Sequence, residues 1–483
     1  MPSIKTNILL NGINTATSLL FPIITFPYAA RVLLPEGIGT INFLNGIISY
    51  IVLFTSLGIP MYAVKEIAKC RDNIKERDKV TVEILILSFA LSILGYIGVW
   101  ILARYVPEVH EQATVFYILS LSIVFNTVGV NWFYQGIEDF KFITVRAIVI
   151  RTLAAAALFI FVKSPFDLVA YAFIIVGSTV GNNIINFIHL RTHITFPNIR
   201  ELRIIHHIKP TLVWFVFNLI VSVYLNLNAV MLGFVCEEIE VGYFTAGSRI
   251  TYIAMSLITS LGTVLLPRCT NLLANDNREE FSVVIRKSLH LTIGLALPIV
   301  CGLMLLSPLI TVVFCGENFL QSISVLTITA PIILFVGLAH VTGFQILYPM
   351  NRTRIVLCSV GVGAIVSLLM NFILLPKYGA IGASVSLMLA ELSVLSVQLI
   401  CGRSFFPFKV RTLINTNILV STLVMAVCII LMLLIPLPTI LQLSSCIIAG
   451  MLVYGSVLYM LHDEQFVEIV VPIINRLKFI KPL

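Results

Sequence analysis

The sequence predicts an all-α polytopic membrane protein, and three observations carry that prediction. The chain is 59% hydrophobic and only 11% charged, whereas soluble chains carry about 25% charged residues. Its apolar residues form about fourteen stretches of roughly 20 residues, each long enough to cross a ~30 Å hydrocarbon core. Basic residues gather in every second connection between these stretches. No connection could form a separate domain of ~50 residues, so the helix bundle must carry the function.

The predicted membrane segments follow one another with short connections. They cover residues 8–30, 38–62, 82–103, 113–136, 143–162, 167–189, 210–234, 241–266, 289–314, 320–348, 355–374, 379–401, 413–435 and 439–461. The first segment carries a polar stripe that includes Asn7, Asn11 and Asn14, and it has no small-residue cleavage site. We therefore expect a retained helix rather than a signal peptide.

The distribution of basic residues predicts the orientation. Of the 31 basic residues, 25 lie at the termini or in alternate connections, while the opposite connections hold only Arg31, Arg104, Lys163 and Lys377. Lysine and arginine concentrate in cytoplasmic loops, so we expect both termini in the cytoplasm. The net charge of +8 then reflects orientation and contact with anionic membrane lipids, not nucleic-acid binding.

Two halves of the sequence echo each other. Gly39 in the first external connection corresponds to Gly242 in the seventh, at an offset of 203 residues, and "SLG" at 56–58 recurs at 260–262. A repeat of six helices is a common plan in transporters. We therefore expect an N-terminal lobe over 1–205, a C-terminal lobe over 206–405, and two added helices with a cytoplasmic tail over 406–483.

Polar side chains recur at helical spacing in segments 1, 2, 7 and 8. One such stripe usually makes hydrogen bonds between helices. Matching stripes in both halves favour a shared hydrated cavity, because a polar face in hydrocarbon must meet protein or water. The candidate substrate-binding residues from these stripes are Asn42, Asn45, Asn218, Ser248 and Tyr252.

Charged residues within the segments are further candidates. Arg249 lies roughly 12 Å into segment 8 at 1.5 Å per residue, and Arg151 lies at similar depth in segment 5. Each needs a partner or water there. Together with Arg31, at the end of segment 1, they suggest an anionic passenger, because guanidinium groups match phosphate bidentately. Glu391, the deepest acid, is the candidate for coupling to an ion.

No enzyme signature is present: the sequence has no GxSxG, no HExxH, no Walker loop and no acidic metal pair. We predict neither catalysis, nor a metal, nor a cofactor. The nine cysteines lie mostly in apolar segments without metal-like spacing, so we expect no disulfides.

Four stretches resemble one family of bacterial polysaccharide exporters. They are "YAARVLLPEGIGTINF" (28–43), "NWFYQGIEDFKFITVR" (131–146), "NAVMLGFVCEEIEVGYFTAGSRI" (228–250) and "LPKYGAIGASVSLMLAE" (375–391). They are similar to the segment 1–2, 4–5, 7–8 and 11–12 connections of O-antigen flippases of the Wzx type, in the same order. The resemblance covers about residues 5–400.

This resemblance implies the fold of the multidrug/oligosaccharidyl-lipid/polysaccharide exporters, with two six-helix lobes in a V shape plus two C-terminal helices. It implies a flippase in the bacterial inner membrane that moves an undecaprenyl-diphosphate-linked oligosaccharide, for O-antigen, capsule or exopolysaccharide, by alternating access. The family's cationic lumen maps onto Arg31, Arg151 and Arg249, although many relatives have lysine at position 249. Expected partners are the lipid-linked glycan, membrane lipids, H⁺ or Na⁺, and a polysaccharide polymerase with its chain-length complex.

Other functions stay open at this point. A lipid II flippase differs only by motif. A drug or cation antiporter of the same superfold should carry acids deep in its first lobe, where this chain has Arg151 and where Glu83 lies at a helix end. A membrane glycosyltransferase or polymerase would transfer sugar in vitro, and a non-transporting scaffold would tolerate loss of the cavity arginines.

Overall fold

The structure, a computed structural model, describes residues 4–195, 197–198, 201–408, 415–463, 465–466 and 468. Within these ranges every regular element is a helix. Eleven of the described helices are long and apolar enough to cross a membrane. The prediction of an all-α polytopic membrane protein is therefore confirmed.

The chain separates into two compact units, Met1–Thr245 and Ala246–Leu483. We call them unit 1 and unit 2. The boundary lies within one long helix, whereas the sequence suggested lobes that meet near residue 205. The division into lobes at 205 and 405 stays a prediction.

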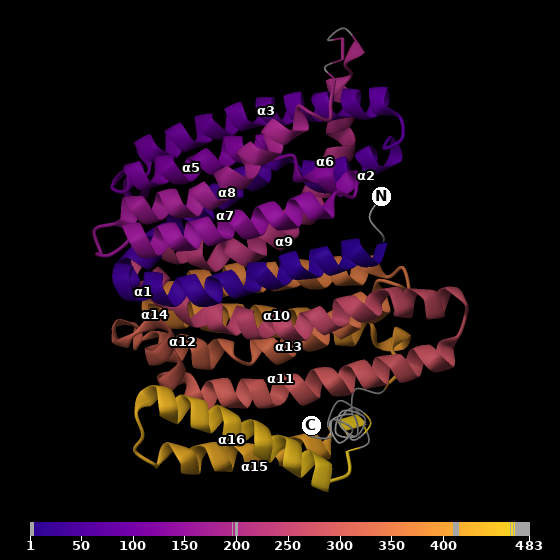
Figure 1. Cartoon of the computed structure of the whole chain (residues 1–483). Helices are drawn as coiled ribbons and strands as arrows, with labels where there is room; N and C mark the ends of the chain where they lie inside the picture. The colour runs from indigo at the N-terminus through magenta and orange to yellow at the C-terminus, as the bar shows by residue number, and fades with distance from the viewer. Residues whose placement is uncertain are drawn as a thin grey trace, which may run out of the picture. The chain divides into compact units, whose positions relative to one another are not determined.

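Unit 1 is built from the first nine α-helices and the start of the tenth (Figure 1). α5 packs against α1, α3 and α8, while α1 also packs against α7 and α9. The bounds are α1 Ile4–Ser56, α2 Ile59–Lys69, α3 Ile74–Tyr105, α4 Pro107–His110, α5 Ala113–Val128, α6 Asn131–Gly136, α7 Phe140–Phe161, α8 Leu168–Leu190, the 3-10 helix η2 Ile204–His207, α9 Ile208–Val235 and α10 Glu238–Ala274.

α1 holds two of the predicted membrane segments, joined at a sharp bend. Leu34 at the bend has φ 62° and ψ 174°, a backbone conformation that residues with a side chain rarely adopt. Pro35 follows and has no backbone N–H to donate, so the helical hydrogen bonding is interrupted there. α14, in unit 2, bends in the same way at Gly379, whose φ is 50°.

Two helices begin earlier than the apolar segments predicted. α3 starts at Ile74 rather than 82, and α11 starts at Arg278 rather than 289. In each case an asparagine caps the helix: the side chains of Asn73 and Asn277 accept a hydrogen bond from the backbone N–H three residues on. Such caps stabilise a polar helix start outside the apolar run.

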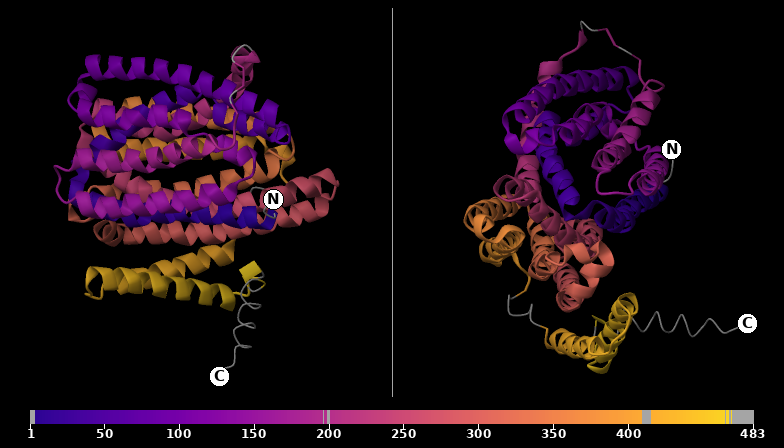
Figure 2. Two further views of the ribbon diagram at one scale, coloured as in Figure 1. Left: turned by 45° about the horizontal axis from the view of Figure 1, so that its top comes forward. Right: turned by 90° about the vertical axis from the view of Figure 1, so that its left-hand side faces the viewer.

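Unit 2 is arranged around α11, which packs against α12, α13, α15 and α16. α15 and α16 form a hairpin (Figure 2). The predicted tenth segment is broken into α12, α13 and a π-helix. The bounds are α11 Arg278–Cys315, η3 Glu317–Phe319, α12 Ser322–Thr329, α13 Ile332–His340, the π-helix η4 Val341–Leu347, α14 Thr353–Cys401, η5 Arg403–Phe405, α15 Thr416–Leu433 and α16 Thr439–Met460.

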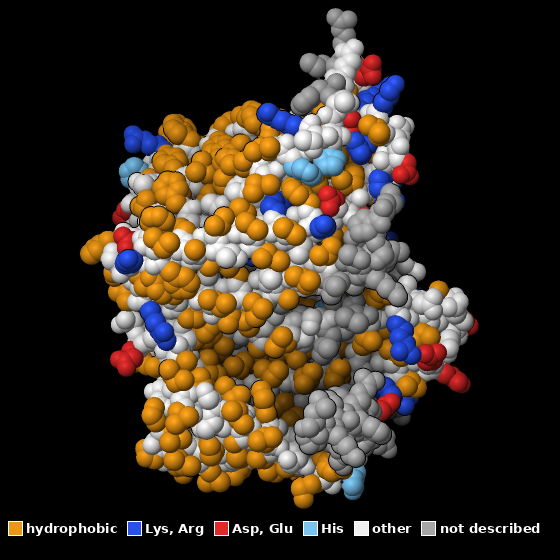
Figure 3. Space-filling model, in the orientation of Figure 1, with side chains coloured by type: hydrophobic (Ala, Val, Ile, Leu, Met, Phe, Trp, Pro, Cys, Tyr) orange, Lys and Arg blue, Asp and Glu red, His pale blue; other side chains and the backbone are white. Residues whose placement is uncertain are grey.

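The surface of the helices suits a lipid environment. On the face seen in Figure 3, hydrophobic side chains cover the middle of the helices, and charged side chains gather toward the helix ends. Large apolar residues such as Phe89, Leu94 and Phe372 are more than half exposed. Soluble monomers rarely expose apolar patches of this extent, so the chain is a multi-pass membrane protein.

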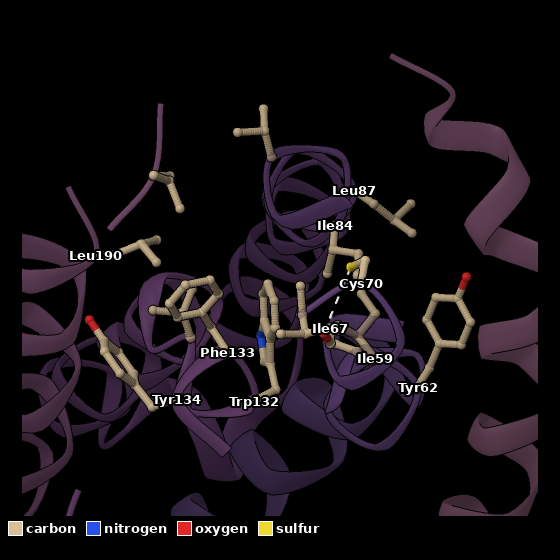
Figure 4. Packing of buried hydrophobic residues seen from close by; sticks show 14 of the residues in the cluster. Ile59, Tyr62, Ile67, Cys70, Ile84, Leu87, Trp132, Phe133, Tyr134 and Leu190 are labelled. Atoms are coloured by element: carbon tan, nitrogen blue, oxygen red, sulfur yellow. Dashed lines mark hydrogen bonds between the residues drawn. The ribbon is translucent and has the colours of Figure 1, made fainter. Parts of the chain in front are cut away.

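One end of unit 1 has its own apolar core, where α2 packs against α6 and α3 (Figure 4). Its centre is formed by Ile67, Ile84, Phe133 and Tyr134, all fully buried. We call this side of the molecule the basic end, because it carries the connections that are rich in lysine and arginine. This core fixes the positions of two short helices: α2, which follows the longer α1, and α6, which follows the longer α5.

Candidate functional site

Arg151 lies in the middle of α7 and is bound to α1. Its Nη1 donates to the backbone carbonyl of Asn14 at 3.1 Å, to Asn14 Oδ1 at 3.1 Å and to Thr17 Oγ1 at 2.8 Å. These acceptors are neutral, and Arg151 forms no ion pair with any described residue. Arg151 therefore contacts the polar stripe of the first segment within unit 1. The sequence analysis had treated the two as separate features.

A second arginine, Arg146, is more deeply buried and was not among the predicted site residues. Only 7% of it is exposed. Its Nε donates to Asn182 Oδ1 at 3.1 Å, and its Nη2 donates to Asn131 Oδ1 at 2.9 Å. Its Nη1 is buried without a hydrogen-bond partner. Arg146 thus joins α6, α7 and α8 through neutral amides alone.

Arg146 also lines an open cavity of about 470 Å³ at the basic end of α7 and α8. Lys141 and His189 line the same cavity, together with one acid, Asp139, whose carboxylate accepts the backbone N–H of Phe142 at 3.2 Å. The cavity that opens onto Arg146 therefore has a net positive charge, because two cations and one acid line it. The sequence feature that could have identified Arg146 is the motif 131–146, which contains both Asn131 and Arg146.

We expect Arg146→Leu to destabilise unit 1 by about 2–4 kcal/mol, because the amide oxygen of Asn182 loses its donor and that of Asn131 keeps only the donor from Asn186. The measurement is thermal unfolding of the purified protein in lipid nanodiscs. Arg191→Leu is the matched control, since Arg191 is exposed at the end of α8. Equal melting of the Arg146 and Arg191 variants would contradict a joining role.

The other predicted residues of unit 1 lie on α1 and α9. Arg31 is exposed near the bend of α1, and Asn45 is exposed on the second half of the helix. Asn42 is half-buried, and its side-chain amide donates to the carbonyl of Ile38 in its own helix at 2.7 Å. Asn218 belongs to α9, but its side chain lies outside the described residues.

The predicted residues of unit 2 lie along α10 and α14. Ser248 is buried, and Arg249 and Tyr252 are half-buried on the same helix. Glu391 of α14 is half-buried and lies close enough to Tyr252 for the two to interact electrostatically. The structure therefore brings Tyr252 and the candidate coupling acid together. The role of each remains a proposal.

The sequence suggested that Glu83 lies at a helix end. In the structure it lies within α3, which begins nine residues before it. The side chain is 3% exposed. It accepts hydrogen bonds from the backbone N–H of Arg203 and, at 2.8 Å, pairs with His207 Nε2. The other ring nitrogen of His207 bonds to Tyr62 at 2.7 Å. This buried acid therefore fastens the connection before α9 to unit 1.

Within unit 1, α1 and the start of α10 cross at very close range. A Cβ at Gly39 would overlap the carbonyl oxygen of Glu238, and a Cβ at Gly242 would overlap the carbonyl oxygen of Pro35. The offset of 203 that relates Gly39 to Gly242 also relates Pro35 to Glu238. The two glycines of the predicted repeat therefore form one reciprocal contact, which the sequence analysis did not foresee.

The π-helix of unit 2 carries a further polar group. Gln345 is fully buried, and neither its oxygen nor its nitrogen has a hydrogen-bond partner. Gln398 of α14 accepts from Thr342 of the same π-helix at 2.6 Å and donates to Ser359 at 3.2 Å. π-Helices are frequent at functional sites. Among the described residues, no group of three or more His, Cys, Asp and Glu side chains could hold a metal ion.

A family model described as polysaccharide biosynthesis protein matches residues 4–273. The chain is 26% identical over 412 residues to a protein of Escherichia coli (strain K12) named "Putative O-antigen transporter", covering 83% of this chain and 97% of that protein. A protein of the same name from Shigella dysenteriae is 25% identical over 404 residues, covering 82% of this chain and 99% of that protein.

Two solved structures have a fold similar to that of this chain. The lipid II flippase MurJ, in an inward closed conformation, superposes with a TM-score of 0.68 at 17% identity, covering 92% of this chain and 99% of that chain. An inward-facing multidrug resistance MATE family transporter of the MOP superfamily gives 0.65 at 17% identity, covering 82% and 97%. The chain therefore has the fold that these two transporters share.

Proposed function

The chain belongs to the polysaccharide biosynthesis protein family, and from that membership we propose that it is a flippase for a lipid-linked glycan. The passenger is an undecaprenyl-diphosphate-linked oligosaccharide, the repeat unit of an O-antigen, capsule or exopolysaccharide. It moves from the cytoplasmic to the periplasmic leaflet of the bacterial inner membrane. The E. coli and Shigella relatives named as O-antigen transporters support this reading.

The observation that carries the proposal is the positive charge of two arginines in the helices of unit 1, neither of which forms an ion pair with a described acid. Arg146 is held by the amides of Asn131 and Asn182, and Arg151 is held by Asn14 and Thr17. A charge held by neutral groups in a low-dielectric setting attracts an anion strongly. A diphosphate supplies such an anion, and the planar guanidinium matches its oxygens.

In this mechanism the chain works by alternating access, with both termini in the cytoplasm. Arg151, Arg249 and Arg31 offset the diphosphate charge, while Asn42, Asn45, Asn218, Ser248 and Tyr252 bind sugar hydroxyls. The prenyl tail stays in the lipid. A proton or Na⁺ bound at Glu391 resets the cycle, and a polymerase with its chain-length complex takes up the product. The half-buried position of Arg249 and the closeness of Glu391 to Tyr252 support these assignments.

Arg249→Ala is expected to slow flipping about ten- to a hundredfold, since one charge-assisted contact to phosphate contributes ~1.5–3 kcal/mol. The assay uses proteoliposomes that contain the purified protein and a native undecaprenyl-diphosphate oligosaccharide. Exposure of the glycan to an external glycosidase measures the rate. Arg249→Lys keeps the charge, so it should keep most of the rate.

Lys209→Ala is the matched control, because Lys209 is an exposed cation outside the proposed cavity. Flipping at the wild-type rate by Arg249→Ala would remove the site and leave the function. Absence of protein-dependent exposure with a matched glycan would remove the function. Lipid II in the same assay tests the nearest alternative passenger, and faster flipping of lipid II would replace the proposed one.

A further inference from the structure

A cavity of about 200 Å³ with both apolar and polar lining lies inside unit 1 at the basic end, and no predicted site residue lines it. Its walls come from the ends of α1 and α5, from α3, and from the first residues of α2 and α6. The polar lining consists of hydroxyl and amide groups with one indole, from Thr55, Ser56, Ser88, Asn126, Thr127 and Trp132. None of the lining residues carries a charge.

Two neighbouring helix breaks create this cavity. α1 ends at Ser56, and Leu57 and Gly58 then have φ 45° and 73° before α2 begins. α5 ends at Val128, and Val130 has φ 34° before α6 begins at Asn131. A β-branched residue at positive φ is a strained outlier, and strain of this kind costs about 1–3 kcal/mol and clusters at ligand sites. Continuous helices would close the space that the two breaks leave open.

The hydroxyl groups of the cavity are prepared to accept hydrogen bonds. Thr55 donates to the carbonyl of Val52 at 3.2 Å, Ser56 donates to that of Leu53 at 3.0 Å, and Ser88 donates to that of Ile84 at 2.8 Å. Each hydrogen is therefore used within its own helix. The hydroxyl oxygens keep lone pairs that can accept from a ligand.

Two lining groups can donate to a ligand. Trp132 is 6% exposed, and its indole N–H has no hydrogen-bond partner among the described residues. Packing fixes its ring, which stands between Phe133 and Ile67 in Figure 4. The side-chain amide of Asn126 is exposed and likewise has no described partner, so it offers both donors and an acceptor. The indole nitrogen of Trp132 is not among the fully buried unpaired atoms, so both groups are accessible and can donate to a ligand in the cavity.

The matching ligand is neutral, carries several hydroxyl groups and has apolar faces. Its hydroxyls donate to the oxygens of Thr55, Ser56 and Ser88 and accept from Trp132 and Asn126, while its apolar faces contact the side chains that complete the wall. The volume equals that of six or seven water molecules at about 30 Å³ each. This is the space of one sugar ring.

We propose that this cavity binds one neutral sugar ring of the transported glycan. The assignment rests on the proposed function, because it names the part of the passenger that enters unit 1. It places recognition of the glycan at the basic end, in α1, α2, α3, α5 and α6, in a cavity that none of the arginines lines. Glycan selectivity then depends on lining residues of which only Ser56 belongs to the polar stripes of the sequence.

The test observes the tryptophan directly. The protein is labelled with ¹⁵N-tryptophan in phospholipid nanodiscs free of glycoside detergents, which would compete, and its three tryptophans are assigned with Trp→Phe variants. Methyl glycosides of glucose, galactose, N-acetylglucosamine and rhamnose are added in turn. We expect at least one to shift the indole signal of Trp132 saturably and to leave that of Trp100, exposed on α3, unchanged. 1,6-Hexanediol controls for a general solvent effect.

Asn126→Leu should weaken this binding about tenfold, the upper end for one hydrogen bond. Asn275→Leu, at an exposed asparagine in the turn after α10, is the control and should not change it. No shift of Trp132 with any glycoside, or the same shift with hexanediol, overturns the sugar assignment. An unchanged affinity in Asn126→Leu, whose fold is checked by its melting temperature, does the same.

A flipping assay with the lipid-linked glycan separates the two proposals. If wild-type protein flips the glycan while Trp132 gives no response, the sugar site is wrong and the transport function stands. If Trp132 responds but no lipid-linked glycan is flipped, the sugar site stands and the transport function fails. Slower flipping by Asn126→Leu identifies the transported glycan as the source of the ring. Unchanged flipping despite lost glycoside binding overturns the role in transport.

Discussion

Gly39→Ala is expected to destabilise the protein by about 3 kcal/mol or more and to abolish flipping. The added methyl group would overlap the carbonyl oxygen of Glu238 and would lie 2.9 Å from the backbone N of Gly242. Overpacking typically costs 1–3 kcal/mol where side chains can give way. Here the obstacle is backbone, so the two helices must separate. The effect is measured as the melting temperature in nanodiscs and as the flipping rate.

Gly98→Ala is the matched control, because a Cβ at Gly98 in α3 meets no atom within 4 Å. It should melt at the wild-type temperature or slightly above, since alanine favours a helix over glycine by about 0.5–1 kcal/mol. Gly242→Ala should resemble Gly39→Ala. The double variant should cost less than the two single costs together, because both methyl groups open the same crossing. Wild-type melting of Gly39→Ala would refute the reciprocal contact.

Asp78→Ala is expected to release the connection between α8 and α9 and to cost about 3–5 kcal/mol. Asp78 is 1% exposed and accepts two hydrogen bonds from Arg77, at 3.1 and 2.8 Å, and two from Thr195, at 2.8 and 2.9 Å. Arg77 also donates to the carbonyl of His193 at 2.6 Å. Removing one partner of a buried pair leaves an uncompensated charge, which is the costly case.

Burial, together with His189 and Arg77 nearby, lowers the pKa of His193, so its ring remains neutral at pH 7 beside the arginine.

In Asp78→Ala, trypsin should cut the released connection between α8 and α9, after Arg191 or Arg203, at least tenfold faster than in the wild type. Asp72→Ala, at an exposed position of the preceding turn, provides the control and should be cut at the wild-type rate. Equal cleavage of both variants would show that Asp78 does not hold the connection.

The fold could be predicted because lipid imposes a simple rule on the sequence. Every spanning segment must be apolar and helical, so hydropathy alone locates the helices. The family model is described as polysaccharide biosynthesis protein, and the E. coli relative is named as an O-antigen transporter. The breaks were not predictable in this way. Val130 is apolar and sits inside an apolar run, and only tertiary packing of α6 against α2 holds it at positive φ.

The candidate site was predictable only in part. Arg151 stood out because it lies deep in an apolar segment, and the structure gives it polar partners on α1. Arg146 was counted among the residues of a basic connection, since its position near a segment end gave no sign of its burial. Ser88 carried no signal, because single hydroxyls are common in membrane helices, and Trp132 stood out only as part of the motif 131–146.

The contact of Gly39 with Gly242 also constrains how the protein is made. Its two sides lie about 200 residues apart in the sequence, and ribosomes add roughly 5–20 residues per second. The segment of α1 that contains Gly39 is therefore synthesised some 10–40 seconds before the segment that contains Gly242. During that interval the polar side chains beside it, Thr40 and Asn42, must be shielded by lipid, by earlier helices or by the insertion machinery. Closure of this crossing is thus a late event in biogenesis, and chains truncated before residue 238 cannot reach it.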